Sequence, residues 1–106
     1  MIIMTLRLTV PPERTADVVQ VIRSMVGPIS VVPGCKHFNL YSDTSNDDAL
    51  MLVQEWEFEE ALEEHIRSDE FRKILAVMEL ASYAPEITFN AVSNRKGFEL
   101  VETLRS

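Results

Sequence analysis

Apolar and polar positions alternate at the start of the chain. Between residues 2 and 10 every even position is apolar, whereas the odd positions include Thr5, Arg7 and Thr9. A repeat of two predicts a β-strand with one buried face. Pro11 and Pro12 end this strand, and Pro12 suits the first turn of a helix.

The repeat then lengthens to that of a helix. Apolar residues at 16, 19, 22 and 25–26 predict a helix from Glu13 to about Pro28, where Gly27-Pro28 predicts its end. Alternation returns in residues 35–42 and 49–57, and the polar loop between these two runs predicts a β-hairpin.

The second half of the chain repeats the helix-then-strand order. Residues 59–67 are predicted to be helical, with Leu62, His65 and Ile66 on the inner side. Ser68 is predicted to be the N-cap of a further helical segment that extends to about Tyr83. Pro85 interrupts the helix, and a last strand is expected at 86–92. For residues 98–104 the pattern fits either a short strand or a helical turn.

The resulting order, βαββαβ, predicts an α+β, ferredoxin-like fold with an antiparallel sheet. We expect a single domain over residues 1–106, with a core at 1–92 and a tail at 93–106. The helices can cover only one face of the sheet. The other face mixes apolar and polar side chains, so we expect a second copy of the chain to cover it, giving a homodimer packed sheet against sheet.

Charge and composition exclude several classes of partner. The net charge of −7 disfavours binding to nucleic acid and to anionic lipid. No apolar run approaches the roughly 20 residues that a membrane span needs. The first residues lack the pattern of a signal peptide, so a cytoplasmic location is expected. The single Cys35 excludes an internal disulfide.

Trp56 and His65 are the residues that point to chemistry. Trp56 ends a strand on the helix side, as either a core aromatic or the wall of a cavity that stacks on a planar ligand. His65 is either a semi-buried, hydrogen-bonded histidine or a general base. Gln54 is a polar residue on the same apolar strand face. Neither histidine has acidic or cysteine neighbours at metal-ligand spacing, so no metal site is predicted.

Four motifs carry a resemblance to a known family. They are P-G-C at 33–35, F-x-L-Y at 38–41, E-W-E-x-x-E-A-L-x-x-H at 55–65 and S-D-x-F at 68–71. With them, residues 2–92 resemble the antibiotic biosynthesis monooxygenase family of the dimeric α/β-barrel superfamily, especially its quinol-monooxygenase-like members. The resemblance implies a dimeric barrel with one pocket per subunit, and oxidation of a small molecule by O2 without a bound cofactor.

The sequence departs from two better-defined branches of that family. The polyketide monooxygenases have Asn four residues before the shared tryptophan and Tyr six after it, where this chain has Leu52 and Leu62. The haem-degrading branch has Asn on the first strand and His on the last helix, where this chain has Leu6 or a neighbour and Leu75. Haem degradation is therefore not expected.

The sequence thus predicts a cofactor-free monooxygenase of a quinol-like or other planar carbon acid. His65 is the expected proton acceptor, with Trp56 beside the ring of the substrate. The remaining expected lining residues are Leu6, Phe38, Leu52, Gln54, Leu62 and Leu75. Two alternatives stay open: a non-enzymatic or stress-associated module that binds a small molecule, and a cofactor-free isomerase.

Overall fold

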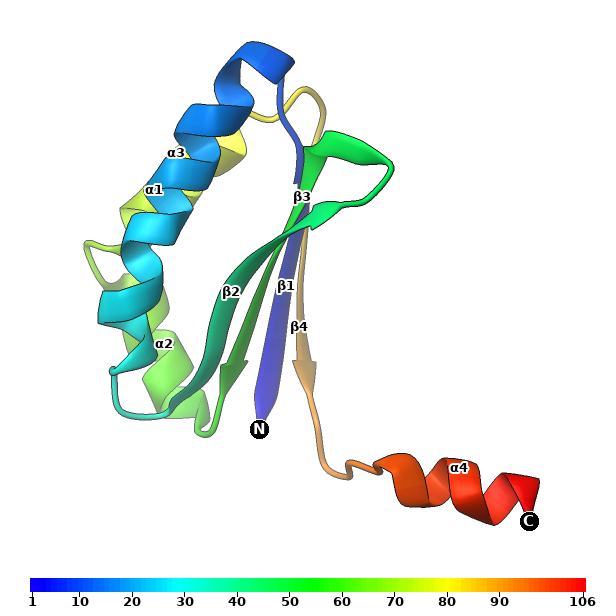
Figure 1. Ribbon diagram of the computed structural model, residues 1–106. Coiled ribbons are helices and arrows are strands. Elements are labelled where there is room, and N and C mark those ends of the chain that lie inside the picture. The colour runs from blue at the N-terminus through cyan, green and yellow to red at the C-terminus, as the bar shows by residue number, and fades with distance from the viewer.

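The computed structural model describes residues 1–106 and has the predicted α+β architecture. The element order is βαββαβ, with the second helix in two pieces and an additional helix at the C-terminus (Figure 1). The elements are β1 (Ile2–Thr9), α1 (Pro12–Ser30), β2 (Cys35–Asp43), β3 (Asn46–Trp56), α2 (Glu59–Arg67), α3 (Phe71–Glu79), β4 (Glu86–Ala91) and α4 (Phe98–Arg105).

The four strands form one antiparallel sheet in the order β2-β3-β1-β4. At one end, which we call the α2 end, Ile2 of β1 lies opposite Trp56 of β3 and Ala91 of β4. At the other end, the hairpin end, Thr9 lies opposite Ala49 beside the β2–β3 turn. The register therefore places Trp56 at the α2 end of the sheet.

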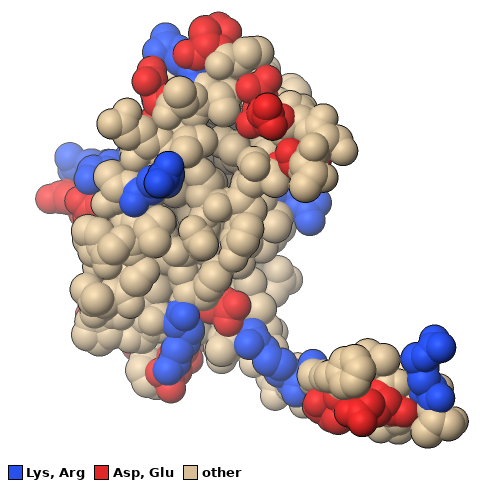
Figure 2. Space-filling view, viewed as in Figure 1, with Lys and Arg blue, Asp and Glu red and all other residues tan.

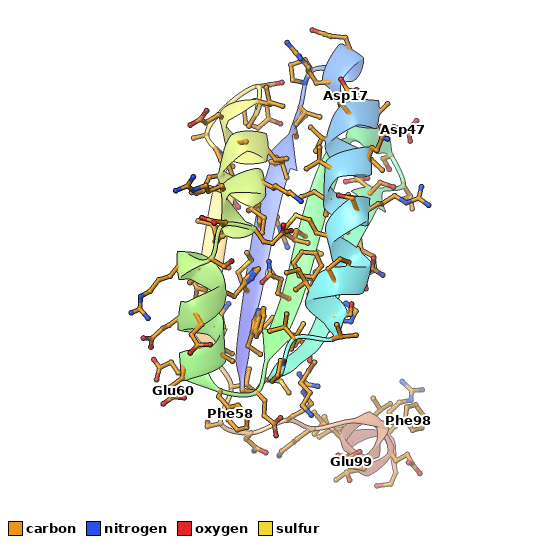
Figure 3. All side chains as sticks on the ribbon, turned by 90° about the vertical axis from the view of Figure 1, so that its left-hand side faces the viewer. Asp17, Asp47, Phe58, Glu60, Phe98 and Glu99 are labelled. Atoms are coloured by element: carbon orange, nitrogen blue, oxygen red, sulfur yellow. The ribbon has the colours of Figure 1, made fainter.

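Helices α1, α2 and α3 cover one face of the sheet (Figure 1). Seen from the helix side, side chains lie between the ribbons of the helices and over the strands behind them (Figure 3), and sixteen apolar residues form one buried core cluster. Met4, Leu6 and Leu8 of β1 are buried there, as the alternation predicted. Helix α1 adds one apolar stripe to the same core, formed by Val18, Ile22, Met25 and Ile29.

The opposite face, here called the open face, is covered by no helix. Alternation places Ile3, Thr5 and Arg7 of β1 on it, opposite Glu55, Val53 and Met51 of β3. None of these six residues is buried in the single chain.

The first helix is longer than expected, because it continues through Pro28 to Ser30. A proline inside a helix removes the hydrogen bond to the carbonyl four residues earlier. Here that carbonyl belongs to Ser24, which is exposed and open to water. Burial of Ile29 holds the last turn in place. The expected stop at Gly27-Pro28 was therefore wrong.

Ser68 lies between α2 and α3 and contacts both. It is the C-cap of α2, and its hydroxyl donates a hydrogen bond to the His65 carbonyl (2.6 Å). The same hydroxyl accepts a hydrogen bond from the Phe71 amide (3.4 Å), as predicted for an N-cap, although Glu70 occupies the N-cap position itself. Helix α3 begins only at Phe71 and ends at Glu79, four residues before the expected end. In the C-terminal tail, residues 98–105 form a helix, which decides between the two forms that the sequence left open. No helix combines the length and the apolar composition required to cross a membrane.

Candidate active site

Trp56 and His65 lie against each other in the core at the α2 end. Trp56 is the last residue of β3 and is fully buried, and His65 on α2 is 5% exposed. Their ring centroids are 4.8 Å apart and the ring planes differ by 27°, which is a stacked arrangement. Strand alternation and the inner side of α2 thus bring together the two residues that the sequence singled out.

His65 is enclosed by aromatic rings. Phe71, the first residue of α3, stacks on it at 5.3 Å with an interplanar angle of 15°. Phe38 of β2 meets it edge-on, with centroids 6.2 Å apart. Phe71 was not among the predicted site residues, although the S-D-x-F motif at 68–71 contains it. The imidazole therefore lies in a dry aromatic environment.

Gln54 is oriented by Trp56. The indole N–H donates a hydrogen bond to the Gln54 Oε1 atom (2.9 Å), and both side chains are fully buried. This bond leaves the two protons of the Gln54 Nε2 amide group without any acceptor. The glutamine is thus a fixed hydrogen-bond donor inside an otherwise apolar core.

His65 carries the second unsatisfied atom, since its Nε2 is buried without a hydrogen-bond partner. Burial lowers the pKa of His65, and the nearby Glu70 carboxylate only partly offsets this effect. The imidazole is therefore neutral at pH 7. A neutral imidazole has one nitrogen with a free lone pair, so it is able to accept a proton.

Two orphaned polar atoms in one small core are costly. Each buried donor or acceptor without a partner costs about 1–3 kcal/mol. All the other buried residues of this core are apolar, and leucine would fill these positions at no such cost. Unpaired groups of this kind that persist in a folded protein are candidates for a functional role.

The structure brings five of the six predicted lining residues into this core and excludes one. Leu6 and Leu52 lie opposite each other on neighbouring strands, and both are buried. The others that are buried are Phe38, Gln54 and Leu62. Leu75 is 51% exposed, so its predicted place in the site was wrong. On α3 the inward stripe is Phe71, Ile74 and Val77, with spacing i, i+3, i+6.

The site is closed, because the rings themselves occupy the space in which the sequence predicted a cavity. One opening at this end of the sheet is a groove of about 300 Å³ between α2 and β4. Its walls include Leu62, which lies three residues from His65 on α2, and Ile2, which lies opposite Trp56. A second pocket, of about 540 Å³, lies at the hairpin end and includes Arg7, Tyr41 and Met51 of the open face.

The other reactive side chains lie outside this core cluster. The Cys35 thiol donates a hydrogen bond to the His37 carbonyl (3.6 Å), and burial raises its pKa, so it remains protonated. His37 Nε2 and the Tyr41 hydroxyl are 2.9 Å apart on the open face. No three His, Cys, Asp or Glu side chains come together in a way that could hold a metal ion.

Comparisons with known proteins agree with this fold. Residues 1–77 match the family model described as antibiotic biosynthesis monooxygenase. A conserved protein from Methanosarcina mazei Go1 is 27% identical, with a TM-score of 0.76 over 84% of this chain and 89% of its own. Rv0793 from Mycobacterium tuberculosis is 21% identical, with a TM-score of 0.79 over 91% of this chain and 98% of its own. No curated protein matches the chain.

A further structure, itself named an antibiotic biosynthesis monooxygenase, has a TM-score of 0.78 at 18% identity over 89% of this chain and 100% of its own. The family match spans 77 of the 106 residues and includes Gln54, Trp56, His65 and Phe71. The chain therefore belongs to the antibiotic biosynthesis monooxygenase family.

Proposed function

We propose that the protein is a cofactor-free monooxygenase that oxidises a quinol-like or other planar carbon acid with O2. The observation that carries this proposal is the pair of unpartnered buried atoms, His65 Nε2 and Gln54 Nε2, beside the Trp56 ring. One atom is able to take a proton and the other is able to donate a hydrogen bond to an oxygen. Deprotonation of a carbon acid next to a carbonyl requires these two functions.

His65 Nε2 accepts the proton from the acidic CH2 carbon of the substrate. The electron pair of the broken C–H bond moves onto the neighbouring carbonyl oxygen, which receives a hydrogen bond from the Gln54 amide. The resulting anion transfers one electron to O2, and the substrate radical and superoxide combine to form a C–O bond. Protonated His65 then returns its proton to the peroxide.

Loss of water from this hydroperoxide converts the original CH2 group into a carbonyl. The substrate carbon loses four electrons, and O2 gains four. One oxygen atom ends in the product and the other in water. In this scheme the substrate is the only reductant.

The closed core must open for a substrate to enter. The groove between α2 and β4 supports an entry route past Leu62, because this side chain belongs to both the groove and the buried core. A planar ring that displaces Phe71 or Leu62 would stack on Trp56 or His65, and its oxygen would meet Gln54 Nε2. Binding then supplies the partner that both orphaned atoms lack.

Oxygen uptake with a panel of hydroquinones and anthrones tests the proposal. His65→Ala and Gln54→Leu are each expected to lower kcat/KM by at least tenfold, since general-base catalysis contributes about 10²–10⁴-fold. His37→Ala is the matched control, because this second histidine lies on the open face. Undiminished uptake in His65→Ala would remove the assigned base.

Two alternatives would give different results in the same assay. A cofactor-free isomerase shares the deprotonation but turns its substrate over without O2. The apolar residues Leu52 and Leu62 favour the other alternative, a module that only binds an apolar molecule. Such a module would bind the panel compounds and consume no oxygen.

We also propose that the functional unit is a homodimer packed through the open face. Ile3, Met51 and Val53 on this face are half-buried in the single chain, next to polar Thr5 and exposed Asn39. A mixed sheet face of this kind supports burial against a second sheet about 10 Å away.

A further inference from the structure

Helix α4 carries apolar side chains that pack on nothing. Phe98 is 71% exposed and Leu104 is 76% exposed, and none of the eight residues of this helix is buried. Figure 2 shows α4 well clear of the body of the molecule. Its side-chain hydrogen bonds are all local, for example from the Thr103 hydroxyl to the Glu99 carbonyl (2.8 Å).

A helix of this length needs a packing partner. Isolated helices shorter than about 12–15 residues are marginal in water, and most helical stability in proteins comes from packing of an apolar face. Phe98, Val101 and Leu104 are spaced i, i+3, i+6 and form such a face. A surface outside its own body must therefore cover this face, which we call the α4 stripe.

The direction of α4 indicates where that surface lies. The Arg95 guanidinium forms an ion pair with Glu55 (3.2 Å), a residue of β3 on the open face. This ion pair holds the segment between β4 and α4 against the open face at the α2 end of the sheet. Helix α4 then projects away from α1, α2 and α3 on the open-face side (Figure 1). In the view from the helix side, labelled Phe98 and Glu99 lie beyond the lower end of the body (Figure 3).

The other end of the open face provides an apolar pocket. This pocket of about 540 Å³ lies at the hairpin end, and seven of its twelve lining residues are hydrophobic. Met51 and the exposed Tyr83 are two of them. The charged lining residues of the pocket are Arg7, Asp43 and Glu86, and Arg7 takes part in none of the ion pairs of the chain. The β2–β3 hairpin curls toward the open-face side above it (Figure 1).

From these placements we infer that the α4 stripe docks in the hairpin-end pocket of a second copy of the chain. Two sheets that pack face to face are related by a two-fold axis in the plane between them. When this axis is perpendicular to the strands, the α2 end of one sheet lies over the hairpin end of the other. Each α4 then meets the partner's pocket, and the two contacts are identical.

The alternative axis, parallel to the strands, does not fit these shapes. It places both curled hairpins at the same end and both α4 helices at the other. Each hairpin then faces the partner's hairpin, and each α4 faces the partner's α4 instead of the pocket. The lengths are compatible with the perpendicular axis. Stacked sheets lie about 10 Å apart, and an eight-residue helix is about 12 Å long. Helix α4 is therefore long enough to span the gap and reach the partner's pocket.

The contact is chiefly apolar. Phe98 and Leu104 supply apolar side chains for the partner's Met51 and Tyr83 positions. Asp43 and Glu86 line the pocket beside Arg7, so apolar packing rather than ion pairing with Glu99 or Glu102 carries the contact. Residues 98–105 lie beyond the 1–77 segment that matches the family model. This contact rests on the proposed open-face homodimer and is independent of the oxidation chemistry.

Disulfide trapping between two differently sized chains tests this inference. In a Cys35→Ala background, Leu104→Cys is placed in a chain that carries a large tag, and Met51→Cys in an untagged chain. The two are mixed and oxidised mildly. We expect a mixed-size disulfide dimer to form at least tenfold faster than in the control, which pairs Leu104→Cys with Arg23→Cys on the exposed side of α1.

A second experiment measures how substitutions in the α4 stripe change self-association. Phe98→Asp combined with Leu104→Asp is expected to weaken self-association at least tenfold in sedimentation, while circular dichroism shows the βαββαβ core still folded. Ser106→Ala is the matched control. Dimerisation unchanged by the double substitution, or trapping no faster than with Arg23→Cys, would overturn the inference. A monomer at all concentrations, or a disulfide formed within one chain when both cysteines are present together, would do the same.

Discussion

At the residue scale, the main feature is a neutral histidine held in an aromatic cage. Phe71 and Trp56 flank the His65 ring, and Phe38 meets its edge. The cage excludes water, so the pKa of His65 falls below its usual 6.5. Burial keeps the His65 ring neutral at neutral pH, so its lone pair is free to accept a proton. The same burial means that protonation of His65 destabilises the fold.

This coupling predicts how stability depends on pH. Well above pH 6.5 the histidine is neutral in both folded and unfolded chains and contributes no pH dependence. As the pH falls below 6.5, the unfolded chain takes up a proton before the folded chain does. The free energy of unfolding should therefore decrease, until the pH passes the lowered pKa of the folded state.

Urea denaturation between pH 5 and 8 measures this effect. His65→Leu should remove the part of the acid loss that arises in this range, whereas His37→Ala on the open face should leave it in place. An unchanged pH profile in His65→Leu would contradict the proposed coupling. The Glu70 carboxylate opposes the effect of burial, so Glu70→Gln should lower the folded-state pKa of His65 further. The loss should still begin near pH 6.5, where the unfolded chain takes up its proton, but should extend to lower pH and become larger.

At the scale of elements, the turn before β2 fixes the position of α2 relative to the sheet. Gly34 has a φ of 91°, a backbone conformation that side chains rarely adopt. A Cβ atom added there would come within 2.7 Å of the Ala61 Cβ atom on α2. The Gly34 carbonyl also accepts a hydrogen bond from the Glu57 amide (2.7 Å), just before α2 begins.

Gly34→Ala should therefore destabilise the fold by about 1–3 kcal/mol, through both strain and overpacking. Adding Ala61→Gly should recover only the steric part. Gly27→Ala is the matched control, because Gly27 lies inside α1 and an added Cβ there meets no atom within 4 Å apart from its chain neighbours. The gain in helix propensity of about 0.5–1 kcal/mol is opposed by crowding against the Pro28 ring, so its midpoint should stay close to that of the parent. Equal midpoints for Gly34→Ala and the parent in chemical denaturation would refute this reading of the turn.

Elements with a clear repeat could be predicted from sequence, and those that depend on tertiary contacts could not. The period-two alternation of β1 fixed its buried face, and the E-W-E motif placed Trp56 opposite α2. The continuation of α1 through Pro28 depends on the burial of Ile29, which local rules for proline do not include. On α3, Leu75 and Ile74 are equally apolar neighbours, and only packing against the sheet selects Ile74.

The closed state of the site is likewise a tertiary property. Sequence could predict that Trp56 and His65 share one region, since strand parity and helix spacing determine it. It could not predict that the rings would stack on each other and fill the space between them, because ring orientation depends on Phe71 and Phe38 from other elements. Nor did a local signal show that the Trp56 indole would take the Gln54 carbonyl and leave its amide group unpaired.

At the scale of the whole molecule, the two faces of the sheet differ in burial: helices cover one face, and the open face is exposed in the single chain. The helix face buries the sixteen apolar residues of the core. On the open face, Tyr41 is 43% exposed, and the His37–Tyr41 and Thr5–Thr88 hydrogen bonds are also exposed. With a net charge of −7, two copies repel each other at long range, so short-range apolar packing must hold a dimer together.

A charge in the middle of the open face should therefore separate the copies. Val53 lies near the centre of that face, opposite Thr5 on β1 and Asn39 on β2. We expect the parent protein to sediment as a dimer at micromolar concentration and Val53→Glu to sediment as a monomer. Burying an unpaired carboxylate against a second copy costs several kcal/mol, whereas in the monomer the same carboxylate is hydrated.

Val21→Glu on the exposed side of α1 adds the same charge away from the open face and should remain dimeric. Moderate salt should strengthen the parent dimer by screening the repulsion between like net charges, and should not restore association of Val53→Glu, whose cost is desolvation. A parent protein that stays monomeric, or a dimer lost equally in Val21→Glu, would show that the open face is not the interface.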